Sequence, residues 1–241
     1  MPIPTDEFLS KQRLLVISPH PDDESYGCAG TIARMKDLGA KVFVMVVSAG
    51  DLRHFSEGSP FVTCETREKE FQEAMEYLRV DDFEILYPDT ERHQRLDALP
   101  RREMIEQFEQ KARLSMEKVE PTIVALPAIS YNQDHEAVFR AGFTACRPAP
   151  APRKGVPPIV LAYDNTALFW SMEREKFHPN FYVDITDYLE HKLKALTLHK
   201  SQRKGPLHHA SIENVEYTAR ARGREVSVEA AEGYMCLRFS L

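Results

Sequence analysis

Short apolar segments alternate with longer amphipathic segments along the first half of the chain. The short segments predict buried β-strands, because they are too short for helices and are bounded by residues that break regular structure. They cover residues 14–17, 42–47, 83–87 and 122–126. The first two contain no polar residue, which is typical of strands in a sheet that is covered on both faces.

The segments between these strands have the pattern of helices. Residues 26–38 precede Gly39, a suitable C-terminal cap, and residues 63–79 carry an apolar stripe at helical spacing. A third helix begins near Pro100, because proline is well tolerated in a first helical turn. The alternation of strand and helix predicts an α/β fold, with an open, mostly parallel sheet and helices on both faces.

The C-terminal third, about residues 148–241, is less regular. It opens with a proline-rich surface loop that extends to residue 158. A strand is predicted at residues 159–163 and a helix at residues 187–200. The chain has no internal repeat and no clear domain boundary. We therefore expect a single domain over residues 1–241, decorated by its C-terminal third.

Charge and composition exclude several classes of protein. The net charge is −6 and no long basic run is present, so we expect no nucleic-acid partner. The four cysteines are far apart and form no CxxC pair, which argues against a structural zinc site and a disulfide framework. The N-terminus has no apolar leader, and no segment approaches the length of a membrane span. A cytoplasmic protein without an integral membrane segment is the expectation.

Two polar clusters follow the first and the fourth predicted strands. They are His20-Pro-Asp-Asp-Glu24 and Asn132-Gln-Asp-His135. In open α/β sheets, ligands bind just beyond the carboxyl ends of the strands. The two clusters are far apart in the chain, but this rule places them on the same edge of the sheet, where they can form one site.

His20, Asp23 and His135 form a suitable set of ligands for a metal ion. Three protein ligands leave one position open, as in a catalytic zinc site, whereas a structural site uses four. Such an ion makes a water molecule a usable nucleophile near neutral pH. Asp22 is too close to Asp23 to share the ion, so we expect it to accept a proton from the water and return it to the leaving amine. The alternative is that Asp22 or Asp23 only caps the following helix.

At these residues the chain resembles the LmbE/PIG-L family of zinc-dependent N-deacetylases. The resemblance is carried by Ser18-Pro-His-Pro-Asp-Asp-Glu24, Gly27-Cys-Ala-Gly-Thr31 and Asn132-Gln-Asp-His-Glu-Ala-Val138. Weaker matches are Thr66-Arg-Glu68, Pro88-Asp-Thr90, His199-Lys-Ser-Gln202 and Ala231-Glu-Gly-Tyr234. The first motif is highly specific, and the others follow in the family's order over nearly the whole chain.

The resemblance implies a Rossmann-like fold and removal of an N-acetyl, or another N-acyl, group from an amino sugar or its glycoside. It implies Zn²⁺ at the three ligands named above, with Fe²⁺ as the alternative metal, and Asp22 as general base and acid. Arg67 and Asp89 resemble the family's contacts to sugar hydroxyls. The competing interpretations are an exposed helix residue for Arg67 and a turn residue after Pro88 for Asp89.

Asn132 departs from the family's pattern. Many members have a histidine at this position, whose charge can help to stabilise the tetrahedral oxyanion. Asparagine can donate a hydrogen bond but has no charge, and one well-placed donor contributes roughly 3–4 kcal/mol. Either Asn132 suffices beside the metal, or another residue supplies the positive charge. His199 is the candidate, and the alternative is a solvent-facing histidine near a helix end.

Two acidic residues beside the predicted ligands have two interpretations each. Asp134 either fixes the tautomer of an imidazole ligand or is the N-cap of the helix that begins there. Glu24 either serves the site or is merely favourable in a first helical turn. The sequence does not separate these alternatives.

Two other functions compete with deacetylation. A nucleotide-dependent Rossmann enzyme is disfavoured, because no GxGxxG follows the first strand and the paired aspartates would repel a pyrophosphate. A non-catalytic sugar-binding or scaffold protein of the same fold is the main alternative, although it would need no proton acceptor beside three ligands. Loops at residues 48–61 and 147–158 are expected to select the substrate. The sequence leaves the exact substrate, the acyl group, the native metal and the oligomeric state open.

Overall fold

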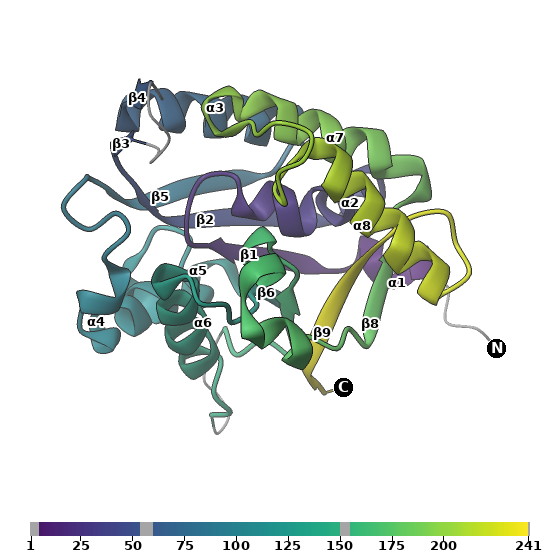
Figure 1. Ribbon diagram of the computed structural model, residues 1–241. Helices are drawn as coiled ribbons and strands as arrows, with labels where there is room; N and C mark the ends of the chain where they lie inside the picture. Colours follow the sequence, from purple (N-terminus) through teal and green to yellow (C-terminus); the bar gives the residue numbers. More distant parts are fainter. Residues whose placement is uncertain (1–4, 54–59, 150–154, 241) are drawn as a thin grey trace.

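The computed structural model describes residues 5–53, 60–149 and 155–240. At its centre lies a seven-stranded sheet with the strand order β5-β2-β1-β6-β7-β9-β8 (Figure 1). Its strands are β1 (Arg13–Ser18), β2 (Lys41–Ala49), β5 (Asp82–Pro88), β6 (Ile123–Pro127), β7 (Ile159–Tyr163), β8 (Phe181–Asp184) and β9 (Ala231–Phe239). Two further strands, β3 (Leu52–Arg53) and β4 (Phe61–Val62), pair with each other in antiparallel orientation.

The α-helices are α1 (Thr5–Ser10), α2 (Asp23–Asp37), α3 (Cys64–Tyr77), α4 (Arg101–Glu106), α5 (Met116–Val119), α6 (Gln133–Ala145), α7 (Leu189–Leu198) and α8 (Ile212–Glu225). Shorter helical turns are η1 (Leu96–Ala98), η2 (Gln107–Lys111), η3 (Thr166–Trp170), η4 (Met172–Lys176), η5 (Thr186–Tyr188) and η6 (Lys200–Gln202). None of the helices in the described ranges has both the length and the hydropathy that a membrane span requires.

The sheet confirms the predicted α/β class. Strands β5, β2, β1, β6 and β7 are parallel, and β9 is antiparallel to both β7 and β8. The alternating pattern did not predict β8 and β9, because half-buried and polar residues interrupt their apolar positions. The C-terminal third therefore contributes three strands to the same sheet. Of its proline-rich loop, residues 150–154 lie outside the described residues.

Helices cover both faces of the sheet, which explains why its central strands are apolar throughout. Helices α2, α3, α7 and α8 lie on one face, and α4, α5 and α6 lie on the other (Figure 1). Along β1 the side chains alternate between two hydrophobic cores. Leu14 and Val16 belong to the core under α2 and α3, whereas Leu15 and Ile17 belong to the core under α4 and α6.

Helix α2 packs tightly against the sheet and the segment that follows β8, and two glycines make this approach feasible. A Cβ atom at Gly27 would lie 2.2 Å from Cδ2 of the Tyr163 ring, and one at Gly30 would lie 2.8 Å from Ile185. The Tyr163 hydroxyl in turn donates to the carbonyl of Ile17 in β1 at 3.2 Å. The glycines of the Gly27–Thr31 motif are thus required by packing.

A buried ion pair fastens α2 to α7 and β9. Lys192 lies 2.6 Å from Glu232 and also donates to the carbonyl of Tyr26 at 2.5 Å. The Glu232 carboxylate accepts the backbone N–H groups of Gly30 and Thr31 at 3.0 and 2.7 Å. Removing one partner of such a pair leaves an uncompensated buried charge, which is strongly destabilising. The pair therefore fixes the helix that begins at the functional edge of the sheet.

Several helices differ in detail from their predictions. Helix α2 begins at Asp23, three residues before the predicted start. The helix after Pro100 changes from an α-helix to a π-helical turn at Gln107, although Phe108 is buried as expected. The segment predicted as one helix at residues 187–200 begins as a 3₁₀ turn.

Replacing Gly27 by alanine tests the close approach of α2. The added methyl group would overlap the Tyr163 ring, so we expect the free energy of unfolding to fall by about 1–3 kcal/mol. Urea denaturation followed by circular dichroism measures this change. Gly205→Ala is the matched control, because no atom lies within 4 Å of its Cβ position. A Gly27→Ala protein as stable as the control would contradict the packing argument.

Candidate active site

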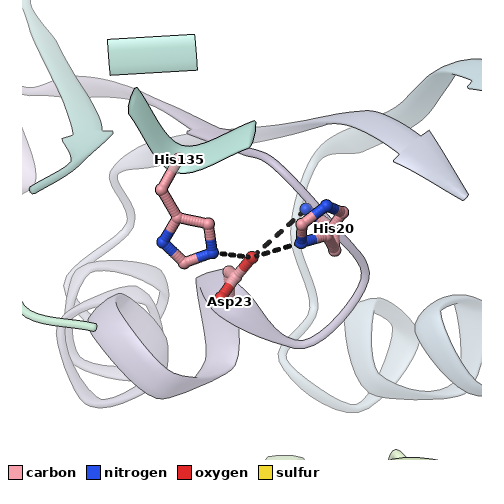
Figure 2. Close-up of side chains that lie close together, drawn as sticks. All are labelled: His20, Asp23 and His135. Atoms are coloured by element: carbon pink, nitrogen blue, oxygen red, sulfur yellow. Dashed lines mark hydrogen bonds and ion pairs between the residues drawn. The ribbon is translucent and has the colours of Figure 1, made fainter. Parts of the chain in front are cut away.

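The predicted clusters meet at the carboxyl edge of the sheet. Strands β1 and β6 are neighbours and parallel, so the segments that follow them emerge side by side. His20 comes from the turn between β1 and α2, Asp23 is the first residue of α2, and His135 comes from the first turn of α6. One ligand atom from each of these three buried residues lies within 4.8 Å of the others (Figure 2). The fold thus assembles a His/Asp/His group that could hold a metal ion.

Asp134 orients the imidazole of His20. The Nε2 atom of His20 lies 2.8 Å from Oδ2 of Asp134, whose Oδ1 accepts the backbone N–H of Leu96 at 2.9 Å. This arrangement places the ring proton on Nε2 and leaves Nδ1, which lies 3.3 Å from Asp23, to face the cluster. The N-cap of α6 is Asn132, whose Oδ1 accepts the backbone N–H groups of Asp134 and His135. The alternative interpretation of Asp134 as the N-cap is therefore wrong.

The charges within the cluster are strongly coupled. Burial lowers the pKa of His20, but its hydrogen bonds with Asp134 and Asp23 outweigh burial and raise this pKa to about 9. Burial raises the pKa of Asp23, but His135 and His20 outweigh it and hold this pKa well below its usual range. A metal ion binds the neutral imidazole, so it must displace the proton from His20.

The three side chains fit a divalent metal ion of the zinc type. Two imidazoles and one carboxylate are the borderline and hard donors that zinc accepts in catalytic sites. The Oδ2 atom of Asp23 lies 3.2 Å from Nε2 of His135, so both histidines direct a ring nitrogen toward the same carboxylate (Figure 2). Three ligands from the protein would leave a coordination position of such an ion for a substrate or water.

Asp22 has a strained backbone conformation beside the cluster. Its φ of 116° and ψ of −31° lie in a region that side chains other than glycine rarely adopt. Asp22 occupies the N-cap position of α2, but its side chain makes no capping hydrogen bond, so the carboxylate is not used to cap the helix. Burial and the neighbouring Asp23 raise the pKa of Asp22 to about 7. A carboxylate with such a pKa is suited to exchange a proton near neutral pH.

Glu24 holds this conformation of Asp22 from within the core. Its fully buried carboxylate accepts the backbone N–H of Asp22 at 3.1 Å and the Ser25 hydroxyl at 2.8 Å. Its Oε1 atom also lies 3.3 Å from Nε2 of His199. The carboxylate thus joins the start of α2 to the end of α7. Glu24 is therefore more than a favourable charge in a first helical turn.

His199 is buried at the C-terminal end of α7, with 2% of its surface exposed, so the interpretation as a solvent-facing residue is wrong. Burial lowers the pKa of His199, but the contact with Glu24 and the charge of Asp22 outweigh it and raise this pKa above its ordinary value. These contacts favour the positively charged form of an imidazole that is separated from solvent.

Arg67 is also buried, which excludes its interpretation as an exposed helix residue. It belongs to α3 and is 4% exposed. Its guanidinium donates to Nε2 of His93 at 2.6 Å and to the carbonyl of Pro21 at 3.3 Å. The positive charge lowers the pKa of Asp22, opposing burial, which places the guanidinium near the predicted proton carrier.

His93 is a site residue that the sequence reasoning missed. It is 5% exposed, and its ring meets that of His20 edge to face, with centroids 5.0 Å apart. Burial, with the charges of His20 and Arg67, lowers the pKa of His93 to about 2, so the ring is neutral. The available signal was its position: it follows β5, whose carboxyl end lies at the same edge of the sheet as that of β2.

Asp89 and Asn132 lie at the rim of this site. Asp89 follows β5 in a turn, where its carboxylate accepts the backbone N–H of Arg92 at 2.8 Å and pairs with the Arg92 side chain at 2.7 Å. Asn132 uses Oδ1 to cap α6, so its Nδ2 is the polar atom that remains for a ligand. The predicted substrate contact of Asp89 and the oxyanion role of Asn132 remain predictions.

Comparisons with known proteins agree with this geometry. Residues 15–146 match the family model described as PIG-L: GlcNAc-PI de-N-acetylase. A Bacillus cereus protein named as a probable N-acetyl-alpha-D-glucosaminyl L-malate deacetylase 2 is 28% identical over 214 residues, which cover 85% of this chain and 90% of that protein. The diacetylchitobiose deacetylase of Thermococcus kodakarensis is 27% identical over 203 residues, covering 82% of this chain and 72% of the relative.

A solved structure supports the same relationship. A conserved protein from Thermus thermophilus superimposes with a TM-score of 0.73 and 27% identity, over 95% of this chain and 96% of that chain. The matched family region contains all three residues of the His/Asp/His group and spans more than half of the chain. This chain therefore belongs to the PIG-L family and is a deacetylase, an amide hydrolase of a typically zinc-dependent family.

Proposed function

We propose that this deacetylase removes the N-acetyl, or another N-acyl, group from an amino sugar or its glycoside, with zinc held by His20, Asp23 and His135. The observation that carries the proposal is the buried His/Asp/His group beside Asp22, whose pKa is raised toward neutrality. The names of the Bacillus and Thermococcus relatives both describe N-acetylated sugars, which supports the substrate class. Fe²⁺ is the alternative metal for the same ligands.

The metal and Asp22 have complementary tasks in this proposal. When bound, the metal supplies a Lewis acid that polarises the acyl carbonyl and makes a water molecule more acidic. Asp22 takes a proton as that water attacks the carbonyl carbon, and then gives it to the amide nitrogen as the C–N bond breaks. Glu24 accepts the backbone N–H of Asp22 in its strained conformation, in which the Asp22 carboxylate makes no capping hydrogen bond and stays available to carry a proton.

Two residues are candidates to stabilise the negative charge that develops on the carbonyl oxygen. The Nδ2 group of Asn132 can donate to this oxygen directly, since Oδ1 is already used to cap α6. His199 contacts Glu24 and Ser25 through Nε2, so its positive charge is held beside Asp22 and acts on the oxyanion through space. In this division, Asn132 supplies the hydrogen bond and His199 supplies the positive charge.

Arg67 and Asp89 are the proposed contacts to the sugar. The guanidinium of Arg67 lies between His93 and Pro21, close to the proton carrier, so it can orient a sugar ring whose acyl group enters the metal position. Asp89 is half-exposed at the rim, where it can accept a hydroxyl group from the same ring. Orientation of this kind lowers the entropic part of the barrier.

Asp22→Asn tests the proton carrier. The amide keeps the shape of the side chain but cannot accept a proton, so we expect kcat to fall roughly 10²–10⁴-fold while bound zinc is retained. Primary-amine release from a panel of N-acetylated amino sugars and glycosides measures turnover, and atomic absorption measures zinc. His135→Ala is the contrasting variant and should lose both zinc and activity. Near-normal turnover by Asp22→Asn would exclude the role of this residue.

Asp134→Asn tests how His20 is prepared for the metal. The neutral amide no longer stabilises the Nε2–H tautomer as strongly, so we expect the zinc affinity to fall roughly 10–100-fold. Competition with a chromophoric chelator measures the affinity. Glu136→Gln is the control, because Glu136 lies on the same helix but pairs with Arg140 at the surface. Equal zinc affinities of the two variants would show that Asp134 does not orient the ligand.

His199→Ala tests the source of positive charge. A unit charge that acts over several ångströms inside a protein contributes on the order of 1–2 kcal/mol. We therefore expect kcat to fall about tenfold or more, with little change in zinc content. Steady-state kinetics on the best substrate of the panel checks this. Unchanged turnover in a folded His199→Ala protein would eliminate the hypothesis.

A further inference from the structure

The buried guanidinium of Arg67 has neutral hydrogen-bond partners. Its two Nη atoms donate to a ring nitrogen of His93 and to the carbonyl of Pro21. Within the described ranges, neither of these partners is a carboxylate, and the buried Nε of Arg67 has no hydrogen-bond partner. A guanidinium has five N–H donors, so several remain for a ligand. The contacts that fix the Arg67 guanidinium therefore decide where its free N–H groups can meet a ligand.

His93 is held at both ends of its ring. Arg67 can only donate, so Nε2 of His93 must be the unprotonated acceptor in their 2.6 Å hydrogen bond. The proton then resides on Nδ1, which lies 3.2 Å from the hydroxyl of the fully buried Ser48. Both ring nitrogens are thus occupied, and His93 is not part of the His/Asp/His group. Its geometry suits neither a metal ligand nor a proton carrier.

Gly50 allows His93 to enter the site. A Cβ atom at Gly50 would lie 2.5 Å from Cβ of His93 and 2.9 Å from Cα of Thr90. The next residue, Asp51, donates its backbone N–H to the Thr90 hydroxyl at 3.0 Å. The loop after β5 is therefore fastened to the end of β2, and His93 is directed inward toward Arg67.

We propose that His93 is a positioning residue that fixes the Arg67 guanidinium over the site, and through it the sugar ring of the substrate. This inference rests on the proposed contact between Arg67 and the sugar. Ser48 holds the Nδ1 end of the His93 ring, Nε2 of His93 fixes the orientation of Arg67, and the remaining N–H groups of Arg67 bind the sugar. His93 acts on substrate binding through Arg67 and does not touch the reacting atoms.

Two substitutions of His93 separate this role from general stability. His93→Leu removes the acceptor, and because a hydrogen bond to a charged group is lost, we expect KM to rise roughly 10–100-fold. The change in kcat should be smaller, and the zinc content should be unchanged. His93→Gln offers an oxygen near the position of Nε2, so it should restore most of the affinity. A fall in kcat at unchanged KM would overturn the proposal.

A double-mutant cycle with Arg67→Ala makes the test sharper. If His93 acts only through Arg67, then adding His93→Leu to Arg67→Ala should leave KM unchanged, because the group that it positions is already absent. If each substitution instead raised KM by its own factor, and the two factors multiplied in the double variant, the proposal would be contradicted. All variants are first compared with the wild type by circular dichroism and thermal unfolding. Ser48→Ala removes the partner of Nδ1 of His93, so it should also raise KM.

A measurement that does not depend on catalysis separates the positioning role of His93 from the proposed deacetylation. The ¹⁵N NMR spectrum of the histidine rings in the metal-free wild-type protein should show His93 as the Nδ1–H tautomer. Arg67→Ala should change this signal. If no sugar is deacetylated but the tautomer is as expected, the proposed function fails while the His93–Arg67 arrangement stands. If His93 is instead the Nε2–H tautomer, the positioning proposal fails whatever the substrate.

Discussion

The close contact between α2 and the sheet is the constraint on which the site depends. Gly27 lets the helix approach the Tyr163 ring, and the buried pair of Lys192 and Glu232 fixes the helix against α7 and β9. The residues just before and within the first turn of this helix include Asp23, a proposed metal ligand, and Asp22, the proposed proton carrier. Small displacements of α2 would therefore move both groups relative to His135 on α6. A misplacement of catalytic groups by about 1 Å can strongly reduce the rate.

The site separates the pKa values of two adjacent carboxylates. Asp23 is surrounded by imidazoles that hold its pKa well below the usual range, whereas burial and the charge of Asp23 raise the pKa of Asp22 to about 7. Neighbouring acids with opposite shifts are typical of sites in which one remains charged and the other exchanges a proton. The positive charges of Arg67 and His199 both lower the pKa of Asp22 and limit this rise. The division of tasks therefore follows from the environment of each carboxylate.

The sequence predicted the parts of this arrangement that have local signals. Apolar periodicity located the parallel strands, and the rule for their carboxyl ends brought His20, Asp23 and His135 together. The sequence did not predict β9, or Glu232 as the group that holds α2. The hydrogen bonds of Glu232 with Gly30 and Thr31 join residues about 200 positions apart in the chain, and such contacts leave no local signal. His93 was missed for a related reason, since only the folded loop after β5 shows that it faces Arg67.

The central claim is that His20, Asp23 and His135 form a metal centre in which His20 uses Nδ1. A crystal structure of the zinc-loaded protein, with zinc located by anomalous scattering, tests this most directly. The account predicts one zinc ion bound by Nδ1 of His20, Nε2 of His135 and the Asp23 carboxylate, with Asp134 still hydrogen-bonded to Nε2 of His20. Zinc at other residues, or bound through Nε2 of His20 with the Asp134 contact broken, would contradict it.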